Sequence, residues 1–329
     1  EINGIGPIDL LVVNLYPTSG FDIGGPALTR AAAKNCEHVA VVTNPNQYPE
    51  LIASLQPGTT LKQRQEWAVS ALLLTAKYDL ALLKERSEPL RYGENPHQKA
   101  SFSGDLNAMF EQLNGKELSY NNLVDTHAAL QLIQEFTEPT FAIIKHTNVC
   151  GIASRSNLES AWDVALSSDP ESAFGGVLIA NKEIDEVIAE KIASIFFEIL
   201  IAPSFTEKAI ELLSAKKNRI LLQQKNTVTT TTEFKNILNG VLTQSCDHSN
   251  YSKWEEVGAH NCSDAEKEDL NFANLVCKHL KSNAIALVKN KQLIGKGCGQ
   301  TSRIDSLRQS IEKAKQFNFD LNGAVLASD

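Results

Sequence analysis

The alternation of hydrophobic and polar positions along the chain predicts an α/β protein. Short apolar runs, which are typical of buried strands, occur at residues 8–15, 38–42, 141–144, 174–180 and 199–203. Apolar residues at helical spacing fall between these runs, at residues 26–34, 61–86, 128–136, 158–166 and 184–195. Because strands and helices follow one another throughout, we expect helices packed on a largely buried sheet.

Breaks in this pattern suggest how the chain divides. The step at residues 87–89 contains a proline and ends the long helical pattern. Residues 223–233 and 247–269 are polar with little periodicity, so we expect a loop and a linker there. The length of 329 residues agrees with two or three domains, each with its own core.

A series of short motifs occurs twice, which indicates an internal duplication. The first series consists of residues 142–146, Cys150-Gly151, Ser154-Arg155, a helix and residues 176–180. The second consists of residues 286–290, Cys298-Gly299, Ser302-Arg303, a helix and residues 323–327. Self-similarity at one spacing also arises by chance in α/β chains. A real duplication would give two like subdomains, and ligand sites commonly lie between such subdomains.

Composition and charge disfavour several classes of protein. Hydrophobic residues make up 43% of the chain, yet no apolar run approaches the roughly 20 residues of a membrane-spanning helix. The net charge of -8 disfavours nonspecific binding to nucleic acid. None of the six cysteines forms a CxxC pair or a zinc-binding spacing, which predicts reduced thiols without a structural metal. The first residues show no signal-peptide pattern, so we expect a cytoplasmic location.

The strand at residues 141–144 ends in Lys145-His146 and continues toward a segment that contains Gly151, expected to be a loop. Loops at strand ends are where catalytic groups collect. A lysine cation beside an imidazole favours the neutral, proton-accepting ring, and it can stabilise a developing negative oxygen. This combination suits acyl or formyl transfer. The alternative is a structural pair on the surface.

Four further segments combine polar side chains with turn formers. Residues 90–98 include Arg91, which would suit an anion such as phosphate, although a solvated turn is the alternative. Residues 115–122 lead into a helix whose N-terminus could hold a phosphate or carboxylate. Residues 169–176 carry paired glycines, which suit either close approach of a ligand or a tight turn. Residues 295–303 are glycine-rich but match no standard phosphate-binding motif.

Taken together, eight strings resemble one family, the bifunctional AICAR transformylase/IMP cyclohydrolases of purine biosynthesis. In chain order they are DLLVVNLYP, DIGGPALTRAAAKN, LRYGENPHQ, KELSYNN, IIKHTNVCG, DPESAFGG, SNAIALVKN and GQTSR. They occur in family order and span nearly the whole chain. The resemblance implies formyl transfer from the cosubstrate 10-formyltetrahydrofolate to the AICAR amine, giving FAICAR. Ring closure of FAICAR to IMP with loss of water then follows, and no metal is required.

The same resemblance implies a fold and an assembly. A Rossmann-like (methylglyoxal-synthase-like) N-terminal domain is followed by two cytidine-deaminase-like α/β subdomains. We expect the cyclohydrolase domain at residues 1–87 and the two transformylase subdomains at residues 88–265 and 266–329. The family pattern further implies a homodimer with sites at the subunit interface and with AICAR, FAICAR and IMP as ligands, but with no nucleic acid and no membrane.

Site residues carry over from the matching strings. Lys145 and His146 match the transformylase catalytic pair, in which His146 assists proton removal from the amine and Lys145 supports the imidazole or the oxyanion. Asn283 matches a residue that positions the formyl or amine group. The substrate-binding matches are Arg91, Tyr92, His97, Phe174, Gly175 and Arg303. The cyclohydrolase matches, which polarise the carboxamide and formyl groups, are Tyr16, Asp22 and Lys34. Judged without the resemblance, Lys34 reads as a solvated cation at a helix end.

Several positions depart from the family pattern. Val149 stands where the family usually has proline, and Lys296 and Cys298 replace small or apolar residues, so the loops could be reshaped without loss of chemistry. The connections at residues 17–21 and 79–90 are short for the family. The chain also starts inside the first domain and stops before the family's next segment. We therefore expect segments missing at both ends, with the cyclohydrolase activity belonging to the intact parent protein.

Two other functions remain open at this point. The expected missing ends and the altered GKGCGQ loop are compatible with a noncatalytic module for purine-nucleotide binding or dimerisation. A zinc-dependent deaminase on the related fold is the third possibility, but the chain lacks the HxE and PCxxC ligand motifs of those enzymes.

Overall fold

The computed structural model describes residues 4, 6–16, 22–258 and 261–329. Internal contacts divide the chain into two compact units, each considered by itself below. The first unit contains residues 1–88, 101–104 and 235–242. The second contains residues 89–100, 105–234 and 243–329. The short connection expected at residues 17–21 lies outside the described residues.

The first unit is a small α/β structure. Strand β1 (Leu10–Val12) pairs in parallel with β2 (Ala40–Val42), and helices α1 (Gly24–Lys34) and α3 (Leu61–Arg86) pack against them. The short helices η2 (Pro45–Gln47) and α2 (Tyr48–Ser54) follow β2. A capping box formed by Thr60 and Gln63 starts α3 at the predicted residue. The strand expected at residues 8–15 is shorter than predicted.

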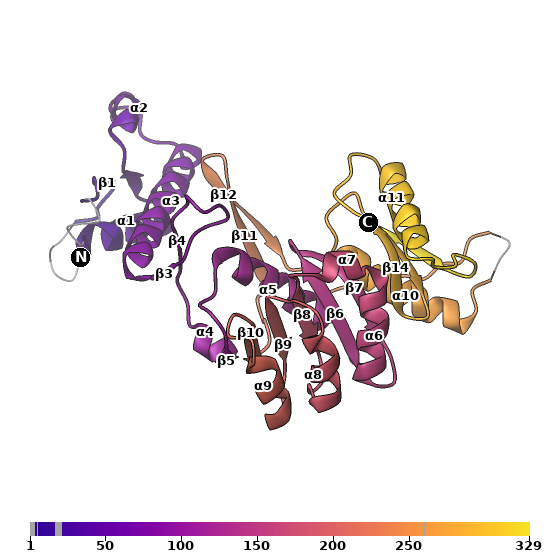
Figure 1. The fold of residues 1–329 in the computed structure, drawn as a ribbon. Coiled ribbons are helices and arrows are strands. Elements are labelled where there is room, and N and C mark those ends of the chain that lie inside the picture. Colours follow the sequence, from indigo (N-terminus) through magenta and orange to yellow (C-terminus); the bar gives the residue numbers. More distant parts are fainter. Residues whose placement is uncertain (1–3, 5, 17–21, 259–260) are drawn as a thin grey trace. The chain divides into compact units, whose positions relative to one another are not determined.

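The second unit is built on one mixed sheet of nine strands, in the order β15-β13-β14-β7-β6-β8-β9-β10-β5 (Figure 1). Strands β8, β9 and β10 run parallel, and the other neighbouring pairs are antiparallel. The strands are β5 (Phe110–Asn114), β6 (Thr140–Lys145), β7 (Asn148–Ser154), β8 (Val177–Ala180), β9 (Ile199–Ala202), β10 (Ile220–Gln224), β13 (Ile285–Lys289), β14 (Gln292–Gly297) and β15 (Val325–Ser328). The α/β class predicted from the hydrophobic pattern is therefore confirmed.

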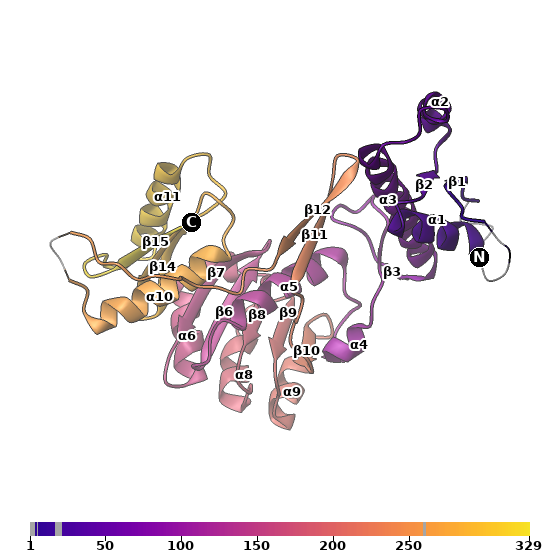
Figure 2. The same ribbon diagram turned by 180° about the vertical axis from the view of Figure 1, so that it is seen from behind.

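Helices cover both faces of this sheet. Helices α6, α8, α9 and α11 lie on one face (Figure 1), while α5 and α10 lie on the other (Figure 2). The helices of this unit are α4 (Leu106–Met109), α5 (Tyr120–Ile133), α6 (Leu158–Ser168), α7 (Pro170–Ala173), α8 (Glu186–Ala193), α9 (Glu207–Ser214), α10 (Asp264–Lys278) and α11 (Arg303–Gln316). The remaining strands of the chain are β3 (Glu88–Leu90), β4 (Ala100–Phe102), β11 (Thr232–Ile237) and β12 (Gly240–Ser245). Helix α10 begins inside the stretch expected to be linker.

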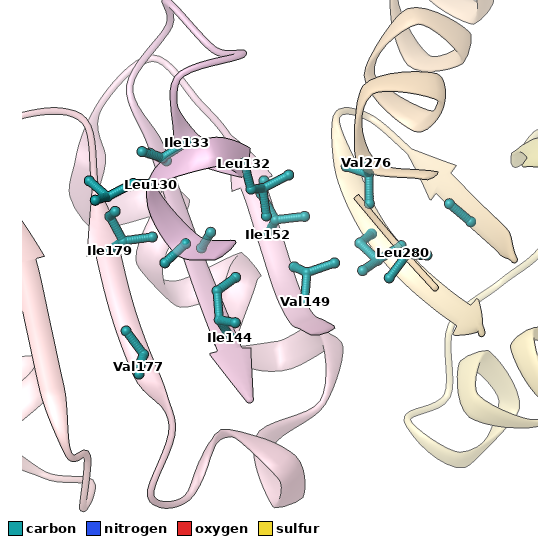
Figure 3. Close-up of a cluster of buried hydrophobic side chains, with 14 of the residues drawn as sticks. Leu130, Leu132, Ile133, Ile144, Val149, Ile152, Val177, Ile179, Val276 and Leu280 are labelled. Atoms are coloured by element: carbon teal, nitrogen blue, oxygen red, sulfur yellow. The ribbon is translucent and has the colours of Figure 1, made fainter. Parts of the chain in front are cut away.

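Strand β6 shows how the sheet separates two cores. Its side chains alternate between faces, so Phe141 and Ile143 pack under α6 and α8, while Ala142 and Ile144 pack under α5. Figure 3 shows the α5 side, where Leu130 and Ile133 meet side chains from β6, β7 and β8. This burial on both faces explains why the strand reads as a continuous apolar run.

The duplication expected from the motifs is present in the order of elements. Helix α5, hairpin β6-β7, helix α6 and strand β8 are repeated as α10, β13-β14, α11 and β15. The two hairpins meet at the centre of the sheet, where β7 lies beside β14. We call these series the first and the second repeat.

The motif pairing within the duplication was partly wrong. Gly151 lies inside β7 rather than in a loop, and a Cβ there would be 2.0 Å from the carbonyl oxygen of Ala165 in α6. Its counterpart in β14 is Gly295, where a Cβ would be 2.3 Å from the carbonyl oxygen of Ser310 in α11. Both glycines therefore allow a helix to lie close on its hairpin. The resemblance of Cys150-Gly151 to Cys298-Gly299 is out of register with the fold.

Candidate functional site

Lys145 and His146 lie at one edge of the nine-stranded sheet, where β6 turns tightly into β7. The hairpin has only two turn residues, His146 and Thr147, because Lys145 pairs with Asn148 across the ladder. Both turn residues have left-handed backbone angles, with φ of 52° and 63°. The ammonium of Lys145 donates a hydrogen bond to the Phe174 carbonyl at 2.6 Å, while His146 is exposed. The sheet edge thus presents an imidazole and an ammonium together.

The carboxylate of Asp125 supports this turn from helix α5. Its Oδ1 accepts a hydrogen bond from the backbone amide of Thr147 at 2.7 Å. Burial raises the pKa of Asp125 above its ordinary value, although the hydrogen bond from Thr147 and the charge of His146 act in the opposite direction. Asp125 is not among the residues predicted from the sequence. The repeat could have revealed it, because Asp269 holds the same place before the second hairpin.

Glu198, at the start of β9, adds a second carboxylate to the same sheet edge. It accepts a hydrogen bond from the Asn122 side chain at 3.2 Å and lies 3.6 Å from the ammonium of Lys116. These two partners belong to the KELSYNN string. Side chains at the predicted helix start, and not its backbone amides, therefore bind a glutamate of the chain itself, and Glu198 also lies near enough to Asp125 to raise its pKa.

The Phe174-Gly175 segment forms the turn between α7 and β8. Asp169 caps α7 by accepting the Ser172 amide at 3.0 Å, and Gly175 has φ of 72°, which favours glycine. The Phe174 ring is 62% exposed and lies 5.2 Å from the Phe196 ring between centroids. The residues expected to form the start of a strand are thus a turn, which carries an exposed aromatic face beside Lys145.

Asn283 and Arg303 from the second repeat lie at the same sheet edge. Strand β13 begins where β14 ends and β7 begins, and Cys298, just after β14, donates a hydrogen bond to the side chain of Asn148 at 3.4 Å. The Asn283 amide donates to the Gln300 carbonyl at 3.1 Å, and Arg303 donates to Ser328 at 2.7 Å. Since β13 and β6 are three strands apart, about 14 Å separates the start of β13 from Lys145.

The LRYGENPHQ string forms a compact loop in the second unit. Gln98 closes the loop by accepting the Asn95 amide at 2.7 Å, and the Asn121 side chain of α5 donates to the Glu94 carbonyl at 3.1 Å. The Arg91 guanidinium lies 5.4 Å from the centre of the Tyr92 ring. His97 is exposed. The loop is therefore tied to the first turn of α5.

The three predicted cyclohydrolase residues lie in the first unit and are divided by helix α1. Asp22 precedes the helix, where its carboxylate accepts the amides of Gly25 at 2.7 Å and Tyr16 at 3.3 Å. Lys34 is the last residue of α1, about 15 Å along the helix axis from its start. Tyr16 and Asp22 are thus brought together, and Lys34 is not brought to them.

A pocket of about 700 Å³ lies between α5 and α10, beside the Thr147 turn. Its walls include Glu135, whose carboxylate binds the Lys278 ammonium at 2.8 Å and the His279 ring at 3.0 Å. Desolvation lowers the pKa of His127, although the charge of Glu233 raises it. No group of three or more potential metal ligands is placed to hold a metal among the residues that the structure describes. In the same part of the chain, no helix is long and apolar enough to cross a membrane.

Comparison with known proteins adds to this geometry. The family model of the AICARFT/IMPCHase bienzyme matches residues 32–313. The chain belongs to the AICARFT/IMPCHase bienzyme family. Similar relatives include the bifunctional purine biosynthesis protein PurH of Bacteroides thetaiotaomicron, which is 47% identical over 99% of this chain and 71% of the relative. The proteins of the same name from Chloroflexus aurantiacus and Persephonella marina are 43% and 38% identical, over 71% and 73% of their lengths.

The AICARFT/IMPCHase match covers most of the predicted site. It includes Lys145, His146 and Asn283, together with every predicted substrate-binding residue of the second unit. It begins after Tyr16 and Asp22, which precede residue 32. The resemblance to this family that was noted from the sequence is thereby confirmed.

Proposed function

We propose that this chain performs the purine-biosynthesis reactions of its family, with formyl transfer from 10-formyltetrahydrofolate to AICAR as the better supported one. The observation that carries this proposal is the hydrogen bond between Lys145 and Phe174 at 2.6 Å, beside the exposed His146. Lys145 and Phe174 come from two separate family strings. Their contact places a base, a cation and an aromatic face at one sheet edge.

In the proposed reaction, the amine nitrogen of AICAR attacks the formyl carbon, and the bond from that carbon to N10 of the folate breaks. His146 takes the proton that the amine loses, and N10 gains a proton as it leaves. The Lys145 ammonium stabilises the negative charge that develops on the formyl oxygen. Asn283 lies just before β13, whose start is about 14 Å from Lys145 within one chain, so it would hold the formyl or amine group from the second subunit of the proposed homodimer. The products are FAICAR and tetrahydrofolate.

The substrate-binding residues suit the parts of AICAR. Arg91 is exposed and offers a planar cation to the phosphate, with Tyr92 and His97 in the same loop. Phe174 offers its exposed ring to the flat heterocycle, and Gly175 lets the backbone approach it. Arg303 supplies a second cation from the other repeat. Because Phe174 and His146 are open to solvent, we propose that a partner subunit completes the site in a homodimer located in the cytoplasm.

The second proposed activity is closure of FAICAR to IMP with loss of water, in the first unit. Tyr16 and Asp22, which lie together before α1, would polarise the carboxamide and formyl groups. Lys34 matches the family's cation but lies at the other end of α1, about 15 Å along the helix axis. We further propose that residues 1–87 form a Rossmann-like domain. Residues 88–265 and 266–329 would form two cytidine-deaminase-like subdomains. The repeated order of elements supports two like subdomains, the second of which begins with α10 at Asp264.

The test is to mix the protein with AICAR and 10-formyltetrahydrofolate and to follow the release of tetrahydrofolate. Wild-type protein should release it, and His146→Ala should lower kcat by about 100-fold or more, the usual contribution of a general base. The matched control is His97→Ala, which should raise KM for AICAR with a smaller effect on kcat. The proposal fails if wild type binds AICAR without turnover, or if His146→Ala turns over like wild type.

A further inference from the structure

The turn that carries His146 is unfavourable for its own residues. Two-residue hairpin turns with left-handed angles at both positions favour asparagine, aspartate and glycine. Here the turn residues are His146 and Thr147, with φ of 52° and 63°. Threonine is β-branched, and its Cβ substituents make a left-handed angle costly, on the order of 1 kcal/mol or more. The hairpin therefore needs support from outside the turn.

Helix α5 supplies that support through Asp125. Its carboxylate accepts the Thr147 amide at 2.7 Å, and this amide belongs to the peptide bond that joins the two left-handed residues. The helix is fixed in turn, because its start is held by the capping box of Ser119 and Asn122 and its apolar face packs on β6 and β8. The acceptor thus sits on a rigid element rather than on a mobile loop.

The second repeat contains the same arrangement. Asp269 on α10 accepts the amides of Asn290 and Lys291 at 2.7 and 2.6 Å. These two residues form the turn of the β13-β14 hairpin, with φ of 52° and 50°. A carboxylate on the preceding helix therefore holds a left-handed hairpin turn twice in one chain. The arrangement belongs to the repeated fold, but only the first turn carries a histidine.

We propose that Asp125 is the positioning residue of formyl transfer, which holds the His146-Thr147 turn so that the imidazole faces the reacting amine. This inference rests on the proposed function of His146. Asp125 acts through the backbone of Thr147 and does not touch the substrate. Its removal therefore affects turnover more than substrate binding, because misplacement of a catalytic group by about 1 Å costs roughly 100-fold in rate.

The test is a set of matched variants in the tetrahydrofolate-release assay. Asp125→Ala removes the acceptor and should lower kcat by about 100-fold with little change in KM for AICAR. Asp125→Asn keeps an acceptor oxygen and should retain most of the turnover. The control is Asp269→Ala, which should lower the unfolding temperature more but leave kcat unchanged at temperatures where the protein is folded. If Asp125→Ala does not fold, Asp125→Leu, similar in size and without an acceptor, replaces it.

A rescue separates positioning from other roles. Glycine adopts left-handed angles without strain, so Asp125→Ala combined with Thr147→Gly should recover part of the lost kcat. Wild-type turnover in Asp125→Ala, alongside an inactive His146→Ala, would overturn the positioning role and leave the proposed function intact. Full turnover in His146→Ala would instead remove the proposed function itself. An equal loss of kcat in Asp125→Ala and Asp269→Ala would also contradict the inference, because it would indicate a general structural effect.

Discussion

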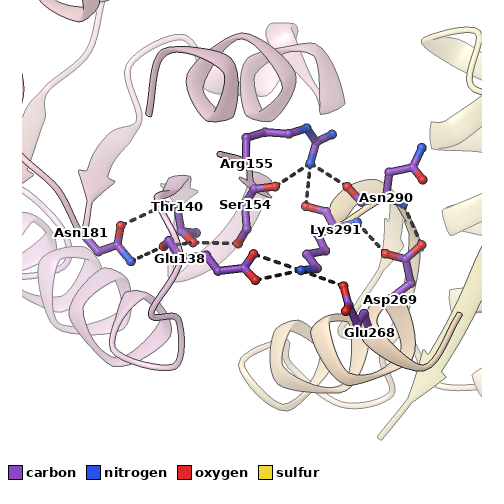
Figure 4. Close-up of polar contacts among 9 residues, drawn as sticks. All are labelled: Glu138, Thr140, Ser154, Arg155, Asn181, Glu268, Asp269, Asn290 and Lys291. Carbon is purple, nitrogen blue, oxygen red and sulfur yellow. Dashed lines mark hydrogen bonds and ion pairs between the residues drawn. The ribbon is translucent and has the colours of Figure 1, made fainter. Parts of the chain in front are cut away.

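The two hairpins, β6-β7 and β13-β14, have the same type of two-residue turn, but the side chains around the two turns differ. In the first repeat, His146 is exposed and the Lys145 ammonium binds the Phe174 carbonyl of a neighbouring turn. In the second repeat, the Lys291 ammonium lies between Glu138 at 2.8 Å and Glu268 at 2.9 Å (Figure 4). One hairpin keeps its turn open, whereas the other uses its turn in ion pairs.

Arg155, which belongs to the first repeat, makes further contacts to the second turn. Its guanidinium donates to the carbonyl oxygens of Ser154 at 2.7 Å and Asn290 at 2.6 Å, and Figure 4 shows it over the second turn. Glu138 and Arg155 belong to the first repeat or its flanks, while Asn290 and Lys291 belong to the second. The second turn thus joins the two repeats. A duplicated hairpin can therefore serve chemistry in one copy and cohesion in the other, according to what covers it.

The largest effect should come from making the first turn resemble the second. His146→Asn introduces a residue that tolerates a left-handed angle, so the fold should persist while the proton acceptor is lost. We expect kcat for formyl transfer to fall by about 100-fold or more. The reciprocal variant Asn290→His should leave kcat unchanged, because we do not expect substrate to bind at the second turn. Wild-type kcat in His146→Asn would show that the histidine is not what distinguishes the first turn from the second.

The next effect concerns the contact between the repeats. Arg155→Ala removes charged hydrogen bonds to the second turn and should lower the free energy of unfolding by about 2 kcal/mol, measured by urea denaturation. Arg308→Ala is the matched control, since Arg308 is 68% exposed and pairs within its own helix. It should cost at most about 0.5 kcal/mol. Equal costs for the two variants would mean that Arg155 does not join the repeats.

The smallest effect concerns Glu135, which links the end of α5 to the end of α10. Burial raises the pKa of Glu135, but the hydrogen bonds from His279 and Lys278 lower it by more, so the folded pKa lies below 4.5. Its contribution to stability is therefore complete above that pH and is lost as the pH falls through the folded pKa. Glu135→Gln should cost about 1 kcal/mol at neutral pH. The unfolding free energy of Glu135→Gln should also fall less steeply than that of wild type as the pH is lowered below 4.5. An equally steep fall would show that Glu135 does not stabilise the contact between α5 and α10.

Local features of the sequence predicted the positions of helices and strands far better than they predicted which residues of the two repeats correspond. Helix α3 occupies the predicted residues because the capping box at Thr60 and the break at residues 87–89 are both local. The boundary errors have physical causes as well. The strand expected at residues 174–180 begins only at Val177, because Gly175 has a left-handed angle and Asp169 closes a helical turn just before it.

The chemistry of the site could be predicted only in part. Lys145 and His146 stood out because polar residues follow an apolar strand, and Asn283 and Arg303 came from family strings. Asp125 and Glu198 were missed, since each acts through contacts that join distant segments of the chain. The tight turn was missed as well, because histidine and threonine rarely adopt left-handed angles. The Thr147 amide is held by Asp125 on helix α5, a contact between distant parts of the sequence.

AICAR should bind at the His146 turn and not at the equivalent turn of the second repeat. A crystal structure of the chain with AICAR would show which turn the ligand occupies. We predict that the AICAR amine lies within about 3 Å of the His146 ring, with Lys145 and Phe174 beside the ligand. AICAR bound at the Asn290 turn, or in the pocket between α5 and α10 with the His146 edge empty, would contradict the account.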